Sequence, residues 1–279
     1  MRFTKMHGCG NDYVFVNGFE VHLADPASVA RAVSLRHTGI GSDGLILILP
    51  SDRADVRMRI FNADGSEAQM CGNGIRCVAK YACEHHLTRA NPMTCETLAG
   101  VLELALTVRD DQVEQIRVNM GCPRLTPSQI PVIIPNQDRV VDYPFRLGEL
   151  HRKGTCVSMG NPHLVFHVAD VAAVDLASEG PQWERLDVFP ERTNVHFVEV
   201  IRPDEVRMRT WERGSGETLA CGTGAAAVCV VGVLTAASER RITAHLPGGD
   251  LQLDWPEGPE APVYMTGPAR EVFTGDWPD

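Results

Sequence analysis

The stretch "VRMRIFNADGSEAQMCGNGIRCV" runs from Val56 to Val78, and 150 residues further on the chain reads "VRMRTWERGSGETLACGTGAAAV" from Val206 to Val228. Nine of the 23 aligned positions are identical, including the Cys-Gly-x-Gly that starts at Cys71 and again at Cys221. Self-similarity at a fixed offset is typical of duplicated structure. The sequence therefore predicts two units built on one plan.

The same offset aligns segments that precede the quoted stretch. Gly10-Asn11 falls on Gly160-Asn161, each before an apolar run, and residues 44–48 fall on residues 194–198. Inside the stretch, residues 56–60 alternate as in a half-buried strand, a Gly/Ser turn follows, and a helical spacing starts after the cysteine. We therefore predict an α/β (α+β) fold with two pseudo-symmetric domains, each mainly stranded and wrapped around a central helix.

The two expected helices differ in their polarity. Ile75, Val78, Ala79 and Ala82 share one face of the first helix, whereas residues 225–237 are apolar on nearly every side. The second pattern predicts a helix that is buried all round. Between the repeats, residues 121–135 are rich in proline, and we expect them to form the linker.

Composition limits the classes of function. The chain has 279 residues, 44% apolar and 22% charged, as in a globular protein, and its net charge of -10 argues against nucleic acid and anionic membranes as partners. Residues 220–237 carry two threonines among many Ala and Gly residues, which favours a buried helix over a membrane span. The first residues do not resemble a signal peptide, and nine cysteines are an odd number. We expect a cytoplasmic protein without a disulfide framework.

Two of the nine cysteines stand apart. The chain has no Cys-x-x-Cys, and the spacing of five residues that separates Cys71, Cys77 and Cys83 suits zinc poorly, so we predict no metal site. Cys77, Cys83 and Cys229 are expected to be core residues. Cys71 and Cys221 precede helix starts, where unpaired N–H groups and positive potential favour a thiolate and lower the cysteine pKa.

The duplication suggests a chemistry for these two cysteines. If the halves face each other about a pseudo-twofold axis, the thiols flank one cavity, and the glycines that follow let backbone N–H groups approach a carboxylate. One thiolate then removes an α-proton while the opposite thiol supplies a proton to the other face. A buried core role is the usual one for a single cysteine. The occurrence of a cysteine before Gly-x-Gly in both halves of the chain instead favours a racemase or epimerase.

The chain resembles the diaminopimelate epimerase family over nearly its whole length. The resemblance is carried by several motifs: "KMHGCGNDYV" (5–14), "GIGSDG" (39–44), "RIFNADGSEAQMCGNGIRC" (59–77), "SMGNPH" (158–163), "ERTNVHF" (191–197), "WERGSGETLACGTGA" (211–225), "LPGG" (246–249) and "YMTGPA" (264–269). It implies that the chain interconverts LL- and meso-diaminopimelate without a cofactor, as a homodimer. It also implies two strand barrels around central helices, comprising residues 1–121 with 266–279, and residues 122–265.

The resemblance assigns residues by position. Cys71 and Cys221 would be the acid/base pair, and His163 and Glu212 would tune the two thiols. The residues expected to hold the reacting carboxylate are Gly72, Asn73, Gly222 and Thr223. The residues expected to contact the rest of the substrate are Asn11, Asn62, Asn161, Asn194, Glu212 and Arg213, with Arg213 as the natural partner for the distal carboxylate. Gly44 departs from the pattern, because some members carry Gln there.

Three alternatives remain at this level. A proline or hydroxyproline racemase of the same fold also uses paired cysteines, but its substrate has no second charged head. An isomerase of the phenazine-biosynthesis type would share the fold without the cysteine pair. A thiol-based metal or redox-sensing protein is disfavoured by the cysteine spacing.

Overall fold

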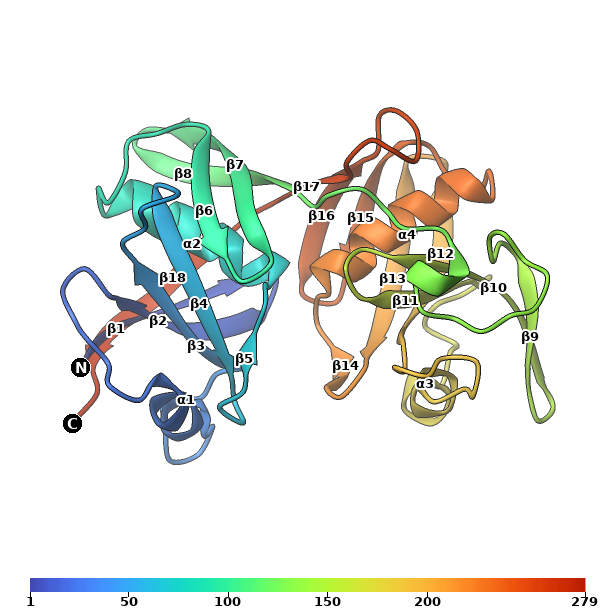
Figure 1. Ribbon diagram of the computed structural model, residues 1–279, viewed down its shortest axis with the longest axis horizontal. Helices are drawn as coiled ribbons and strands as arrows, with labels where there is room; N and C mark the ends of the chain where they lie inside the picture. The colour runs from blue at the N-terminus through green and yellow to red at the C-terminus, as the bar shows by residue number, and fades with distance from the viewer. Residues whose placement is uncertain (279) are drawn as a thin grey trace. The chain divides into compact units, whose positions relative to one another are not determined.

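The computed structural model describes residues 1–278 and divides the chain into two compact units. Unit 1 comprises Met1–Val118 and Thr266–Asp279, and unit 2 comprises Asn119–Met265 (Figure 1). Both units combine many strands with few helices, which confirms the predicted α/β class.

Unit 1 is built of strands around one long helix. Its strands are β1 (Arg2–Gly8), β2 (Asn11–Asn17), β3 (Gly44–Leu49), β4 (Val56–Asn62), β5 (Glu67–Ala68), β6 (Met93–Thr97), β7 (Gly100–Arg109), β8 (Gln112–Asn119) and β18 (Arg270–Asp276). The helix α2 (Gly72–Glu84) packs against most of them, and the short α1 (Pro26–Ser34) lies against β3 and β4. The C-terminal strand β18 pairs antiparallel with β1, so this unit holds both ends of the chain.

Unit 2 repeats the plan. Its strands are β9 (Tyr143–Leu147), β10 (Leu150–Ser158), β11 (Pro162–His167), β12 (Asn194–Arg202), β13 (Glu205–Glu212), β14 (Gly216–Thr218), β15 (Arg241–Leu246) and β16 (Gly249–Asp254). The long helix α4 (Gly222–Leu234) packs against β10, β11, β12, β15 and β16, while α3 (Leu176–Glu184) covers β12, β13 and β14. A 3₁₀ turn, η1 (Pro127–Gln129), precedes the first strand, and β17 (Tyr264–Gly267) leads from unit 2 into unit 1.

The repeat seen in the sequence is reproduced strand by strand. The pairs β2–β3 and β11–β12 are both parallel, and β3–β4 and β12–β13 are both antiparallel. Even the register is kept, since Leu45 pairs with Phe61 in unit 1 and Val195 pairs with Trp211 in unit 2. The long helices start at Gly72 and Gly222, again 150 residues apart. The duplication therefore fixes where each cysteine enters its helix.

The two long helices are buried over most of the predicted length, but α4 ends at Leu234, before the predicted end at residue 237, and residues 233–237 are partly exposed. Ile75, Val78, Ala79 and Ala82 of α2 are all completely inaccessible, and α4 is buried from Gly222 to Gly232 apart from Thr223. The sequence did not single out Arg76, which is also fully buried in α2. Its guanidinium donates to the carbonyl oxygens of Gly72 and Pro268, so the buried charge is compensated by hydrogen bonds.

The proline-rich segment is more than a linker, and that expectation is wrong for its second half. Ile130, Val132 and Ile134 lie in the core of unit 2 together with Phe145 and Trp183. The reason is visible in the sequence, because these apolar residues alternate and bring one side of the segment against the core. Their burial makes the segment part of unit 2.

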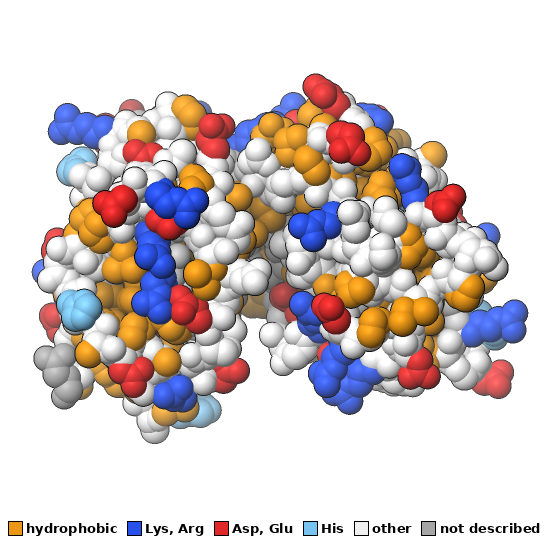
Figure 2. Space-filling model, in the orientation of Figure 1, with side chains coloured by type: hydrophobic (Ala, Val, Ile, Leu, Met, Phe, Trp, Pro, Cys, Tyr) orange, Lys and Arg blue, Asp and Glu red, His pale blue; other side chains and the backbone are white. Residues whose placement is uncertain are grey.

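Acidic and basic side chains are interspersed over the visible surface of both units (Figure 2). Among the described residues 1–278, no helix combines the length and the apolar character needed to cross a membrane.

Gly44, the residue that departs from the resembled pattern, lies where no side chain fits. A methyl group at Gly44 would lie 2.1 Å from the carbonyl oxygen of Phe61 and 2.9 Å from Cε1 of Tyr13. The first atom belongs to the backbone of the paired strand β4, which cannot move aside without disturbing the β3–β4 ladder. Glycine at this position is therefore required by packing in this chain.

We predict that Gly44→Ala lowers the free energy of unfolding by about 1–3 kcal/mol, the usual cost of overpacking. Gly258→Ala is the matched control, because a methyl group there would have no heavy atom within 4 Å. Urea unfolding of both variants measures the difference. Equal stability of the two would contradict the close approach to Phe61.

Candidate active site

In unit 1, Cys71 caps the N-terminus of α2. Its backbone is extended, with φ -138° and ψ 119°, and its sulfur accepts a hydrogen bond from the N–H of Gly74 at 3.4 Å. The thiol donates to Oδ1 of Asn11 at 3.3 Å, and Nδ2 of Asn73 lies 3.4 Å from the same oxygen. Three predicted site residues thus form one cluster, and the helix N-terminus adds positive potential next to the sulfur.

The amide of Asn11 is oriented by acidic and basic groups behind it. Its Nδ2 donates to Asp43 at 2.7 Å, and Arg36 bonds both Asp43 and Asp12. Burial and the charge of Asp12 raise the pKa of Asp43 above its ordinary value. Because Asp43 binds the NH₂ group, the oxygen of Asn11 has to face Cys71. Asp43 was missed by the sequence reasoning, although it lies within the quoted motif "GIGSDG".

Asn62 and Gly72 complete the predicted set in this unit. Asn62 ends β4 and donates to the hydroxyl of Ser66 at 3.0 Å across a turn. Gly72 is the first residue of α2 and is buried. Asn62 is the repeat partner of Glu212, so the two halves carry different polar groups at the end of the same strand.

In unit 2, Cys221 occupies the N-cap position of α4 with an extended backbone, φ -124° and ψ 105°, and is only 4% exposed. The hydroxyl of Thr223 lies 3.6 Å from its sulfur and accepts a hydrogen bond from Nδ2 of Asn161 at 3.3 Å. Oδ1 of Asn161 lies 2.9 Å from Nε2 of His163. Four predicted site residues therefore lie in one connected group at the start of this helix.

The thiol of Cys221 does not have the lowered pKa that we expected from its helix position. Burial raises the pKa well above its ordinary value, and the carboxylate of Glu212 raises it further, while the Thr223 hydroxyl and the Gly224 N–H oppose this. Desolvation and an adjacent negative charge outweigh the helix N-terminus. Glu212 is held in place by the hydroxyl of Thr218, which donates to its Oε1 at 2.7 Å.

Asn194 and Arg213 lie beside each other. The side chain of Asn194 is 2% exposed, donates to the carbonyl oxygen of Pro162 at 3.0 Å and accepts from the backbone N–H of Arg213 at 3.0 Å. Arg213 bonds the carbonyl oxygen of Glu191 at 2.9 Å. Asn194 thus holds the segment that presents Arg213. A recess of about 300 Å³ on this unit is lined by both Arg213 and Asn161.

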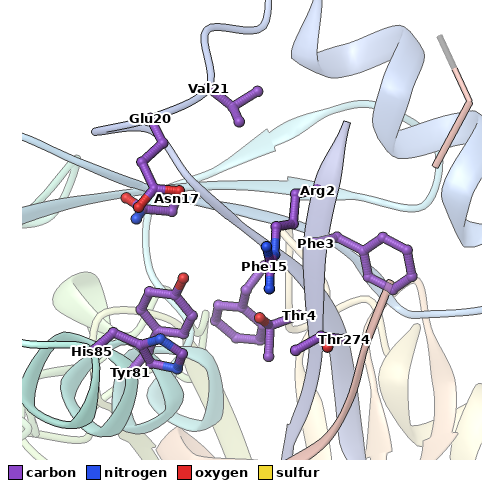
Figure 3. Close-up of a pocket in the computed structure, with 10 residues that line it drawn as sticks. All are labelled: Arg2, Phe3, Thr4, Phe15, Asn17, Glu20, Val21, Tyr81, His85 and Thr274. Carbon is purple, nitrogen blue, oxygen red and sulfur yellow. The ribbon is translucent and has the colours of Figure 1, made fainter. Parts of the chain in front are cut away.

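A second recess, of about 270 Å³, lies on unit 1 and contains none of the predicted site residues (Figure 3). In the close-up, the rings of Tyr81 and His85 stack at one side of it, with centroids 3.8 Å apart. Arg2 and Glu20 also line this recess and make it polar. No cysteine is among its lining residues.

Two buried residues behind His163 escaped the sequence reasoning. Nδ1 of His163 lies 2.9 Å from Nε2 of His196, and Nδ1 of His196 lies 3.0 Å from the hydroxyl of Thr210. Burial lowers the pKa of His163 well below its usual value, helped by the charges of His196 and Arg213, and lowers the pKa of His196 to about 3. Both rings are neutral at pH 7. The signal was present in the sequence, since both strands carry polar residues at inward positions.

Of the other cysteines, Cys77 and Cys229 are buried, which confirms their assignment to the core, and burial raises the pKa of each to about 12. Cys83 is half-buried at the end of α2, with a raised pKa. Their thiols are poorly suited to form thiolates.

Solved structures of similar fold come from enzymes and biosynthetic proteins. A hydroxyproline epimerase from Agrobacterium vitis superposes with a TM-score of 0.72 at 16% identity, covering 99% of this chain and 91% of that one. A phenazine biosynthesis protein of the PhzF family from Bacillus anthracis gives a TM-score of 0.72 at 16% identity, covering 99% and 98%. At such identities the likeness shows the fold alone, which is the one that these epimerases and PhzF-type proteins share.

Sequence relatives identify the family within that fold. Residues 3–126 and 155–272 match the family model described as diaminopimelate epimerase. The diaminopimelate epimerase of Agathobacter rectalis is 54% identical over 99% of both chains, and that of Bacillus subtilis is 49% identical over 98% of this chain and 97% of its own. The chain belongs to the diaminopimelate epimerase family, and it is an isomerase.

The buried imidazoles make stability depend on pH in a defined direction. Burial lowers the pKa of His196 to about 3 in the folded protein, against an ordinary pKa of about 6.5 in the unfolded chain. Between these values the unfolded chain binds a proton that the folded chain does not, so stability falls as the pH drops below about 6.5, by up to about 1.4 kcal/mol per unit.

We predict that His196→Gln reduces this slope, because the variant has lost one of the two buried imidazoles. Urea unfolding of wild type and variant at about pH 7 and about pH 5 measures it. Parallel loss of stability in the two proteins would show that His196 is not held neutral by burial.

Proposed function

We propose that Cys71 and Cys221 are the acid/base pair for the epimerisation of diaminopimelate and address opposite faces of its α-carbon. The proposal rests on one observation above all. Each cysteine caps the long helix of its unit at repeat-related positions, in a chain of the diaminopimelate epimerase family. Inversion needs two groups on opposite faces, and a duplicated fold supplies one group from each half.

The reaction would be a balanced proton transfer. The thiolate of one cysteine takes the α-proton, the electron pair of the C–H bond passes onto the α-carbon and its carboxylate, and the thiol of the other cysteine gives its proton to the opposite face. The first cysteine ends as a thiol and the second as a thiolate, so no cofactor or metal takes part. The negative charge that develops on the carboxylate would be stabilised by backbone N–H groups at Gly72, Asn73, Gly222 and Thr223.

Glu212 would tune Cys221 by raising the pKa of its thiol. A carboxylate next to a buried thiol raises the pKa of that thiol, and a thiolate with a higher pKa is a stronger base toward an α-proton. His163, which is neutral and buried, would tune the site through Asn161. These roles need no charged imidazole, in agreement with the direction of its pKa.

The distal amino-acid head would be bound by charge and amide groups. Arg213 supplies the cation for the second carboxylate, and its position is fixed by Asn194. The remaining polar contacts would come from Asn11, Asn62, Asn161 and Glu212. We further propose a cytoplasmic homodimer that binds neither nucleic acid nor membrane, consistent with a net charge of -10.

We predict that the chain exchanges the α-proton of LL-diaminopimelate for deuterium and leaves L-proline unchanged, because proline has no second head for Arg213. Proton NMR in deuterated water, with each amino acid in turn, measures the exchange. The relatives that are 49–54% identical carry the name diaminopimelate epimerase, which favours this substrate over proline. Exchange with proline alone would exclude it.

We predict that Cys71→Ser and Cys221→Ser each abolish epimerisation, since serine is a far weaker base and acid at neutral pH. The measurement is the turnover of LL- into meso-diaminopimelate, with Cys77→Ser as a control that alters a core thiol outside the pair. The control is expected to lose stability and keep turnover in its folded fraction. Near-normal turnover of either active-site variant would remove that cysteine from the mechanism.

A further inference from the structure

Behind Cys221, unit 2 contains a continuous row of hydrogen-bonded side chains. Each member lies within hydrogen-bonding distance of the next, and the row leads from the strand β13 to the sulfur: Thr210, His196, His163, Asn161, Thr223 and Cys221. The innermost residues are closed off from water, since His163 and His196 are fully buried and Thr210 is 2% exposed.

The neutral state of both rings imposes an order on this row. A neutral imidazole has one N–H and one bare nitrogen, so each ring donates on one side and accepts on the other. Asn161 accepts from Nε2 of His163 and donates to Thr223. His163 therefore accepts at Nδ1 from Nε2–H of His196, whose own Nδ1 accepts from the hydroxyl of Thr210.

The order of donors along the row determines whether a hydroxyl hydrogen points toward the sulfur of Cys221. Because the oxygen of Thr223 already accepts from Asn161, its hydrogen can point at Cys221, 3.6 Å away. In the reverse order, Asn161 would present its oxygen to Thr223, whose hydrogen would turn toward it and away from the sulfur. The direction of donation therefore determines whether a thiolate at Cys221 is stabilised by a hydroxyl donor.

Unit 1 lacks the inner half of the row. The repeat partners of His196 and Thr210 are Ile46 and Ile60, which are buried and apolar. A methyl group at Gly224 would lie 2.2 Å from Cε1 of His196, and one at Gly74 would lie 2.6 Å from Cδ1 of Ile46. Both side chains thus occupy the same place beneath a helix start. Because Ile46 fills this place in unit 1, an isoleucine is enough for packing beneath the helix. The imidazole of His196 therefore has a function other than packing.

We propose that His196 and Thr210 are positioning residues that fix the donor order of His163, Asn161 and Thr223, and so direct a hydroxyl hydrogen toward Cys221. This rests on the proposed role of Cys221 as an acid/base group. It goes beyond that role, because neither residue touches the substrate site, and unit 1 supports Cys71 without them.

The first test reads the donor order directly. In wild-type protein labelled with ¹⁵N-histidine, both His163 and His196 are expected to carry their proton on Nε2 and none on Nδ1, with each signal assigned from its His→Gln variant. Protons on Nδ1 of both rings would show the reverse order and overturn the proposal. This readout does not depend on epimerase activity.

The second test replaces His196 and Thr210 by apolar side chains, because apolar side chains stand at the equivalent positions of unit 1. The double variant His196→Ile/Thr210→Val removes the inner hydrogen bonds at nearly constant volume, whereas Thr210→Ser keeps the hydroxyl. We expect the double variant to lose about 10-fold or more in kcat with little change in KM, as misplaced catalytic groups do. The single variant Thr210→Ser should keep a kcat near that of the wild type.

The matched control is Ile60→Val, which trims the repeat partner of Thr210 without removing a hydrogen bond, and its kcat should stay near wild type. Unchanged kcat in the double variant would overturn the proposal. If the double variant does not fold, Thr210→Val against Thr210→Ser makes the same comparison. Full activity of Cys221→Ser would instead contradict the proposed function, while leaving the donor order measured by NMR unaffected.

Discussion

The structure depends on the close approach of two helix starts to the strands beneath them. Gly74 in α2 and Gly224 in α4 lie so near to Ile46 of β3 and His196 of β12 that no methyl group fits between. This contact brings the first turn of each helix down onto its sheet and places the preceding cysteine at the helix N-terminus. The second glycine of the Cys-Gly-x-Gly motif is thus required by packing. The same packing places the cysteine at the helix N-terminus, where its chemistry becomes possible.

Duplication has preserved the backbone more strictly than the polar groups. Strand pairing and helix starts repeat at an offset of 150 residues, but the asparagines beside the two cysteines are turned in opposite senses. Asp43 holds the amide nitrogen of Asn11, so its oxygen receives the thiol of Cys71. His163 donates to the oxygen of Asn161, so the amide nitrogen of Asn161 donates to Thr223. The hydroxyl hydrogen of Thr223 can then point toward Cys221. One scaffold therefore offers its two thiols different partners.

Most of the fold could be predicted from the sequence, because the repeat constrains both halves at once. Alternation indicated β4 and β13, apolar spacing indicated the buried face of α2, and apolar residues on nearly every side indicated the burial of α4. What escaped prediction depends on contacts between distant strands. His196 and Thr210 stand at positions whose repeat partners, Ile46 and Ile60, are apolar, but only the pairing of β11, β12 and β13 brings the two residues behind His163. The proline-rich segment was interpreted as a linker from its prolines, although the alternation of Ile130, Val132 and Ile134 already indicated a side that packs against a core.

The sequence also predicted which side chains lie near each cysteine better than it predicted their electrostatics. A helix N-terminus lowers the pKa of an accessible thiol, but Cys221 is almost fully buried, and burial disfavours the charged form. The carboxylate of Glu212 works in the same direction. The raised pKa is an advantage for a group that must remove a weakly acidic α-proton. A thiolate whose conjugate thiol has a higher pKa is a stronger base. The donors at the sulfur, Thr223 among them, then matter most at the moment when the charge appears. Burial and Glu212 would set the strength of the base, and the ordered side chains behind it would determine how its charge is accommodated.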